Sequence, residues 1–164
     1  MESNSASQSI PQEPQPTFLT KAYITALADV RILIGAAAVV LPLPAASLFG
    51  LPIASASRGI GQFYGARELV LGGLLYTSYT SYMKLTKQDG IPLKATRDTA
   101  NATIVERKDA LKNVLWACLA VDAIDLGCIA VNAFRGEMGL RALYVSGGAG
   151  VAGVVFAASA LRAL

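Results

Sequence analysis

The sequence has no histidine, only two cysteines and few charged residues. Without histidine it lacks the commonest general base and the commonest metal ligand of proteins, which excludes a serine triad built on histidine. Cys118 and Cys128 lie in one apolar stretch, about 15 Å apart along a helix axis, which is too far for a disulfide. We therefore predict two buried free thiols. With no Cys/His metal spacing and no glycine-rich phosphate loop, we also predict no metal and no cofactor.

Charged residues make up only 15% of the 164 residues, and hydrophobic residues make up 54%. Soluble domains carry about 25% charged residues, so this composition favours a membrane protein. The net charge of +3 is compatible with nucleic-acid binding, but no stacking aromatic side chains accompany the basic segment, as strand-binding modules require. The sequence therefore indicates a lipid bilayer, and not nucleic acid, as the partner of this chain.

Four apolar segments each approach the ~20 residues that cross a bilayer core of about 30 Å. Lipid offers the backbone no hydrogen bonds, so such segments are expected to be helices. A soluble helical bundle is the alternative. The last segment disfavours it, because its only charge is Arg141 and it has no polar face. The predicted spans are residues 22–43, 60–83, 114–134 and 140–161.

The predicted fold is all-α: a four-helix transmembrane bundle of up-and-down topology over residues 18–164, behind a disordered polar N-terminal tail at 1–17. A turn rich in proline and glycine follows the first span, and a long loop at 84–112 follows the second. Nine lysines and arginines fall on the side of this loop and three on the other. This bias places the loop and both termini in the cytosol, and we expect the endoplasmic reticulum or another endomembrane as the location.

Two other features have a structural explanation and a binding alternative. The second span ends in an alternating run of Tyr, Thr and Ser from Tyr76 to Tyr82. An interfacial aromatic belt explains it, and the alternative is a polar mouth for the head group of a ligand. The glycines of the fourth span favour a helix-packing surface, with homo-oligomer contact through this span as the alternative. They are Gly147, Gly148, Gly150 and Gly153.

Five charged residues lie well inside the predicted spans, where one charge costs at least about 2.5–3.5 kcal/mol. Such residues face the bundle interior and pair, or they serve function. A rise of about 1.5 Å per residue places Arg31 and Asp122 at one depth, and Arg67 and Asp125 at another. We therefore predict the pairs Arg31–Asp122 and Arg67–Asp125. The five residues are Arg31, Arg67, Glu68, Asp122 and Asp125.

Glu68 remains as a third carboxylate for two arginines. It shares a helix face with several glycines and is expected to point inward. We predict that it is protonated or solvated by trapped water, because burial disfavours its charged form. A buried carboxylic acid can protonate an alkene, epoxide or carbonyl, so all five charged residues are candidate catalytic residues, with the arginines tuning the acid. The alternative is an ion-pair lock that only specifies packing. A divalent ion is disfavoured because the arginines would oppose it.

Four motifs follow one another in the chain. The strongest is Gly65-Ala66-Arg67-Glu68-Leu69-x-x-Gly72, and the others are Arg31-x-x-x-Gly35, Leu48-Phe49-Gly50-Leu51-Pro52 and Val121-Asp122-Ala123-Ile124-Asp125. Together they resemble a family of small four-span membrane proteins of unassigned function that is common in filamentous fungi. The resemblance implies a four-span fold and no particular reaction. By fold-level analogy, fungi use other small polytopic proteins as cyclases and cofactor-free oxygenases in natural-product pathways.

The leading hypothesis is an integral membrane protein of fungal secondary metabolism. It would act as an acid–base cyclase or isomerase on a lipophilic terpenoid or polyketide. The first alternative is a non-catalytic scaffold whose basic loop binds pathway enzymes or anionic lipids. The second is a small proton-coupled transporter, which the lack of an internal repeat disfavours.

Overall fold

The computed structural model describes residues 16–48, 55–87, 97–136 and 139–164, and the regular elements of these residues are all helices. The predicted all-α class is confirmed for them. Most of the predicted tail, at 1–15, lies outside the described residues, as does part of the turn after the first span. The helices are α1 (Phe18–Val40), α2 (Pro42–Leu48), α3 (Ser55–Lys87), α4 (Arg97–Phe134) and α5 (Leu140–Ala163).

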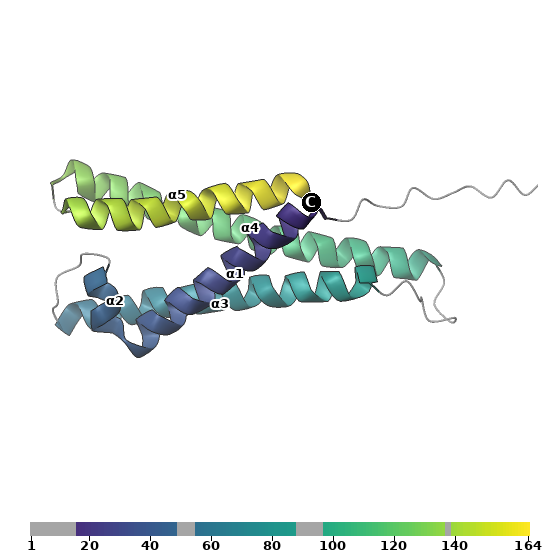
Figure 1. Ribbon diagram of the computed structural model, residues 1–164, viewed down its shortest axis with the longest axis horizontal. Coiled ribbons are helices and arrows are strands. Elements are labelled where there is room, and N and C mark those ends of the chain that lie inside the picture. Colours follow the sequence, from purple (N-terminus) through teal and green to yellow (C-terminus); the bar gives the residue numbers. More distant parts are fainter. Residues whose placement is uncertain (1–15, 49–54, 88–96, 137–138) are drawn as a thin grey trace, which may run out of the picture.

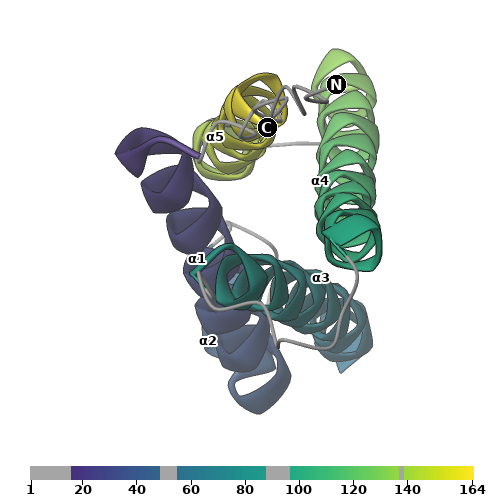
Figure 2. The same cartoon turned by 90° about the vertical axis from the view of Figure 1, so that its right-hand side faces the viewer.

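The four long helices alternate in direction, as Figure 1 shows. Helices α1 and α4 run one way along the bundle and α3 and α5 run the other way, so α1 begins at the same end at which α5 finishes. The closest packing joins α1 with α3 and α4 with α5. Figure 2 shows the four long helices end-on, with the start of α1 beside α5. Helix α1 crosses the bundle obliquely, which brings its start close to α5 and its end close to α2 and α3.

Helix α1 is bounded by local signals on both sides. The side chain of Thr17 caps its start by accepting a hydrogen bond from the backbone N–H of Thr20 at 3.3 Å. The residue before a proline avoids helical dihedrals, and Leu41, which precedes Pro42, ends the helix with φ −125° and ψ 61°. Pro42 then opens α2, because the first turn of a helix leaves its N–H groups unpaired anyway. The predicted first span, at 22–43, therefore ends early, and part of the predicted turn is the short helix α2.

The predicted loop at 84–112 is wrong for most of its length, because α3 continues to Lys87 and α4 begins at Arg97. The segment at 97–112 is polar but contains no glycine or proline and is rich in good helix formers. Leu111 of this segment is fully buried in the hydrophobic core, in the same cluster as Tyr82 of α3. Low hydropathy indicated the end of a membrane span here, but it does not indicate the end of a helix.

Hydrophobic packing is concentrated in one half of the bundle, which we call the closed half. It contains the start of α1 and the end of α5, and its buried side chains come from all four long helices. The other half, which contains α2, the start of α3 and the end of α4, is the open half. The core of the closed half consists of Ile24, Leu27, Ala28, Leu75, Tyr82, Leu111, Leu115, Ala157 and Ala160.

Three helices of the described residues are long and apolar enough to cross a membrane: α1, residues 102–134 within α4, and α5 from residue 142. This agrees with three of the four predicted spans. Helix α3 has the length but not the apolar composition, because it carries Arg67, Glu68 and the run of hydroxyl side chains from Tyr76 to Tyr82.

Glycines allow α1 and α3 to touch through their backbones in the open half. A Cβ atom on Gly35 would lie 2.7 Å from the carbonyl oxygen of Gly65, and one on Gly65 would lie 2.8 Å from the carbonyl oxygen of Gly35. A Cβ on Gly72 would lie 3.0 Å from the carbonyl oxygen of Ala28. This is the small-residue packing typical of transmembrane helices. It draws α1 toward α3 at the level of the buried charges.

Candidate functional site: an ionic chain beside an apolar cavity

The five charged residues predicted inside the spans form one continuous chain of ion pairs, which we call the ionic chain. Arg31 donates to Glu68 Oε2 from Nη1 and to Asp122 Oδ2 from Nη2, both at 2.5 Å. Arg67 donates to Glu68 Oε1 at 2.8 Å and to both oxygens of Asp125, at 2.8 and 2.7 Å. The order is therefore Asp122, Arg31, Glu68, Arg67, Asp125, with charges of alternating sign. It joins α1, α3 and α4.

Both pairs predicted from depth, Arg31–Asp122 and Arg67–Asp125, are present. Glu68 points inward as predicted and is 4% exposed. It is not a surplus carboxylate, however, because it bridges the two arginines. Depth alone did not reveal this bridge. Because α1 and α3 pack backbone to backbone at Gly35 and Gly65, Arg31 is close enough to reach Glu68 as well as Asp122.

The two ends of the ionic chain differ in burial. Arg31 and Asp122 are 4% and 6% exposed, whereas the side chains of Arg67 and Asp125 are about one third exposed. The guanidinium of Arg67 also lies over the ring of Tyr64, 4.7 Å from its centroid, which is a cation–π contact. Tyr64 was missed in the sequence. Its spacing of three residues before Arg67 on one helix is the signal that points to it.

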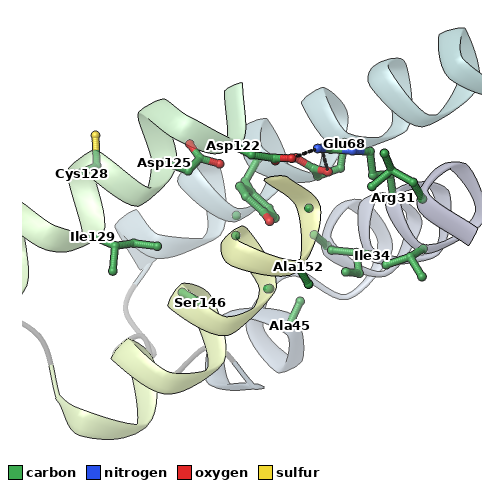
Figure 3. Close-up of a pocket in the computed structure, with 18 of the residues that line it drawn as sticks. Arg31, Ile34, Ala45, Glu68, Asp122, Asp125, Cys128, Ile129, Ser146 and Ala152 are labelled. Carbon is green, nitrogen blue, oxygen red and sulfur yellow. Dashed lines mark hydrogen bonds and ion pairs between the residues drawn. The ribbon is translucent and has the colours of Figure 1, made fainter. Parts of the chain in front are cut away.

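Beside the ionic chain lies a cavity of about 370 Å³ in the open half of the bundle. Arg31, Glu68, Asp122 and Asp125 form its charged end, and most of its remaining lining is apolar (Figure 3). All five helices contribute. Its apolar and small lining residues include Ala26, Val30, Ile60, Cys128, Ala149 and Ala152.

Asp122 is the carboxylate that accepts the fewest hydrogen bonds in the ionic chain. Glu68 and Asp125 each accept hydrogen bonds through both oxygens. Asp122 accepts through Oδ2 alone, and its Oδ1 receives no hydrogen bond from the residues that the structure describes. Because Asp122 lines the cavity, it is the group of the ionic chain best placed to act on a molecule there.

The glycines of α5 divide into two groups. Gly150 and Gly153 face α4: a Cβ on Gly150 would lie 2.8 Å from Leu126, and one on Gly153 would lie 2.5 Å from Asp122 Oδ2. Gly147 and Gly148 have no atom within 4 Å of an added Cβ. The predicted packing surface is therefore present at two of the four positions. The homo-oligomer alternative stays a prediction.

Two other expectations are answered in part. The hydroxyls of Thr77 and Thr80 donate to carbonyl oxygens of their own helix, and the run at 76–82 does not line the cavity beside the ionic chain. The run therefore does not form a polar mouth of this cavity.

Cys118 and Cys128 are free, as predicted, but only Cys118 is buried. Cys128 lies near the end of α4 in the open half, where neighbouring helices cover less of its surface.

Gly153 leaves the space that the Asp122 carboxylate occupies, because a side chain at position 153 would overlap it. We expect Gly153→Ala to push this carboxylate away from Arg31, because the new methyl group overlaps Oδ2. The expected loss of stability is about 1–3 kcal/mol, the usual cost of overpacking. Unfolding in detergent micelles measures it, and the carboxyl bands in infrared spectra report the change at Asp122. Gly148→Ala is the matched control, since an added Cβ there meets open space. Equal effects of the two substitutions would contradict this role of Gly153.

No family model, curated protein or solved structure matches this chain.

Proposed function

We propose that this protein is an integral membrane protein that crosses the bilayer four times and acts as an acid–base catalyst on a lipophilic molecule bound in its cavity. The proposal has two parts: the crossing of α3, and the chemistry of the ionic chain.

Direction along the bundle supports the crossing of α3. Helices α1 and α4 are both apolar enough to span a membrane, and they run the same way. The chain must therefore return across the bilayer between them, and α3 is antiparallel to both. Several of its polar groups have partners that suit lipid: Arg67 and Glu68 form ion pairs, and Thr77 and Thr80 donate to backbone carbonyls at 2.8 and 2.9 Å.

Labelling of engineered cysteines tests this crossing. Arg58 and Lys84 are both exposed and lie near opposite ends of α3. In a background with Cys118 and Cys128 replaced by serine, we expect Arg58→Cys and Lys84→Cys to react with a membrane-impermeant maleimide from opposite sides of oriented vesicles. Reaction of both from the same side would rule out the crossing. Cytosolic labelling of Lys84→Cys would also support the proposed orientation, with both termini in the cytosol.

The observation that carries the chemistry is that Asp122 lines the charged end of an apolar cavity and that its Oδ1 receives no hydrogen bond from the part of the chain that the structure describes. The ionic chain has three carboxylates and two arginines, so its formal charge is −1 when all five groups are ionised. One added proton makes it neutral, which a membrane interior favours. Both oxygens of Glu68 and of Asp125 already accept from arginines, so Oδ1 of Asp122 is the free position for that proton.

A proton held there can start a rearrangement that needs no oxidant or reductant. Asp122 transfers the proton to a double bond, an epoxide oxygen or a carbonyl oxygen of the substrate, which becomes a cation. The ionic chain then carries its charge of −1 beside this cation and stabilises it. After ring closure or bond migration, the cation returns a proton to Asp122 from a neighbouring carbon. The product is an isomer of the substrate, and the acid is regenerated.

A lipophilic terpenoid or polyketide suits this site, because such molecules dissolve in a bilayer and carry alkene, epoxide or carbonyl groups. The setting, fungal secondary metabolism at an endomembrane, rests on the resemblance of the sequence motifs. A scaffold is the second candidate, since α3 and α4 both extend past the predicted spans on the basic side and expose Lys84 and Arg107 to partners.

Metabolite profiling of a producing strain without this gene tests the catalyst. We expect one defined precursor to accumulate while its isomer disappears, because the acid step is lost. Reintroducing wild-type protein restores the isomer, and Asp122→Asn does not, since an amide cannot supply the proton. Asp109→Asn, the same change at an exposed position of α4, serves as the control and is expected to restore the isomer. The quantity measured is the ratio of precursor to isomer by mass spectrometry.

Two results would speak against the catalyst. Full restoration by Asp122→Asn would remove Asp122 from the chemistry. A uniform drop in all pathway products, rescued by Asp122→Asn but not by charge reversal at Lys84 and Arg107, would favour the scaffold instead.

A further inference from the structure

Several residues that line the cavity are themselves exposed. Ala26 and Val30 of α1, and Ala149 and Ala152 of α5, all line the cavity, and all four side chains are exposed. A residue that is both exposed and part of the lining marks a place where the cavity opens. The cavity therefore opens between α1 and α5, and we call this opening the α1–α5 seam.

The seam exists because α1 diverges from α5. In the closed half the two helices touch, and the rings of Tyr23 and Phe156 stack with centroids 5.7 Å apart. Further along, α1 runs obliquely away from α5 (Figure 1), since its backbone is held against α3 at Gly35 and Gly65. Alanines rather than larger side chains line the α5 edge of the seam, so the side chains there do not fill the space.

The seam lies near the middle of both helices. Val30 follows the start of α1 by about 18 Å, and Ala152 follows the start of α5, at the opposite end of the bundle, by about 18 Å. In a bilayer core about 30 Å thick, such an opening faces hydrocarbon and not water. Only a molecule already dissolved in the lipid can arrive there.

A second exposed part of the cavity lining lies closer to the membrane surface than the α1–α5 seam does. Ile60, near the start of α3, and Cys128, near the end of α4, also line the cavity and are exposed. They lie only about 8–9 Å from the ends of their helices, close to the membrane surface. Entry there would suit a molecule that arrives from water or from the head-group layer.

We propose that the α1–α5 seam is a lateral portal through which an uncharged, bilayer-dissolved molecule enters the cavity directly from the hydrocarbon core. This inference rests on the proposed function and names its substrate class. The substrate has an apolar body that the alanines and Val30 accommodate, and one polar or unsaturated group that reaches Asp122. The cavity of about 370 Å³ is near the lower end of the range for ligand sites, about 300–1,000 Å³, so it holds one small molecule.

Photo-crosslinking of the full chain in lipid nanodiscs tests the portal, with dodecanol carrying a diazirine as the probe. In wild-type protein we expect labelled peptides from α1 and α5 around the cavity. Ala152→Trp is expected to abolish this labelling by filling the seam. Val151→Trp is the control, because Val151 is 53% exposed on the same helix at the same depth but does not line the cavity. Val30→Trp and its control Leu33→Trp repeat the comparison on α1.

The outcomes separate the portal from the chemistry. Retained labelling in both Ala152→Trp and Val30→Trp would overturn the portal, as would its loss in Ile60→Trp alone. Circular dichroism must show unchanged helicity in each variant, and Val30→Trp provides the test if Ala152→Trp does not fold. Asp122→Asn is expected to label like wild type. If it does, and no isomer forms from any substrate, the portal stands and the catalyst fails.

Discussion

Arg31→Met is expected to destabilise the protein by about 3–5 kcal/mol, the usual cost of removing one partner from a buried ion pair. Arg31 is 4% exposed and is the cation that pairs with both Glu68 and Asp122 inside the bundle. Its loss leaves the Asp122 carboxylate without a cation and Glu68 with Arg67 alone. Reversible unfolding in detergent micelles, followed by circular dichroism, measures the change.

Arg67→Met is the matched comparison, and we expect a smaller loss. The side chains of Arg67 and Asp125 are about one third exposed, so the protein encloses Asp125 less tightly than Asp122 and leaves it freer to turn toward another polar partner when Arg67 is removed. Adding Asp122→Asn to Arg31→Met should recover part of the stability, because the amide removes the uncompensated charge. Equal losses for the two arginine variants, or no recovery in the double variant, would show that Arg31 does not stabilise the protein by neutralising the buried Asp122 carboxylate.

Gly65→Ala is expected to cost about 1–3 kcal/mol, because the added methyl group would overlap backbone atoms of α1. A Cβ there would lie 2.8 Å from the Gly35 carbonyl oxygen and 2.9 Å from the backbone nitrogen of Val39. Backbone cannot rotate away as a side chain can, so α1 must move from α3, and Arg31 must move from Glu68 with it. The same micelle unfolding experiment measures the loss.

Gly73→Ala on the same helix gives the opposite expectation. An added Cβ at Gly73 meets no atom within 4 Å, and alanine favours a helix over glycine by about 1 kcal/mol. We therefore expect Gly73→Ala to be neutral or stabilising while Gly65→Ala is destabilising. Stability losses of similar size at both positions would contradict this explanation. They would mean that the effect of Gly65→Ala does not come from the close contact between α3 and α1.

Much of the candidate site could be predicted because depth along a helix depends only on position in the sequence. A rise of about 1.5 Å per residue placed Arg31 level with Asp122, and Arg67 level with Asp125, and both pairs are present. The glycines around Glu68 likewise indicated the face that turns inward. The catalytic roles of these residues stay predictions.

Other features could not be predicted, because they depend on the direction and tilt of a helix relative to several neighbours. The oblique path of α1 lets Arg31 reach Glu68, so Glu68 bridges two arginines where a surplus carboxylate was predicted. The continuation of α4 through 97–112 was missed because hydropathy reports the expected membrane boundary and not the end of a helix.

The sequence by itself determined the all-α class, three of the four apolar helices predicted to span a membrane, and which charges within the spans share a depth. Each follows from residue type and spacing within one segment. Only the tertiary structure decided that Asp122 accepts through Oδ2 alone among the described residues, that Gly153 leaves room for this carboxylate, and that exposed residues of both α1 and α5 line the cavity. The physical reason is that the hydrogen bonding of Asp122, the space at Gly153 and the lining of the cavity all depend on how four helices pack together. No single segment of the sequence encodes that packing.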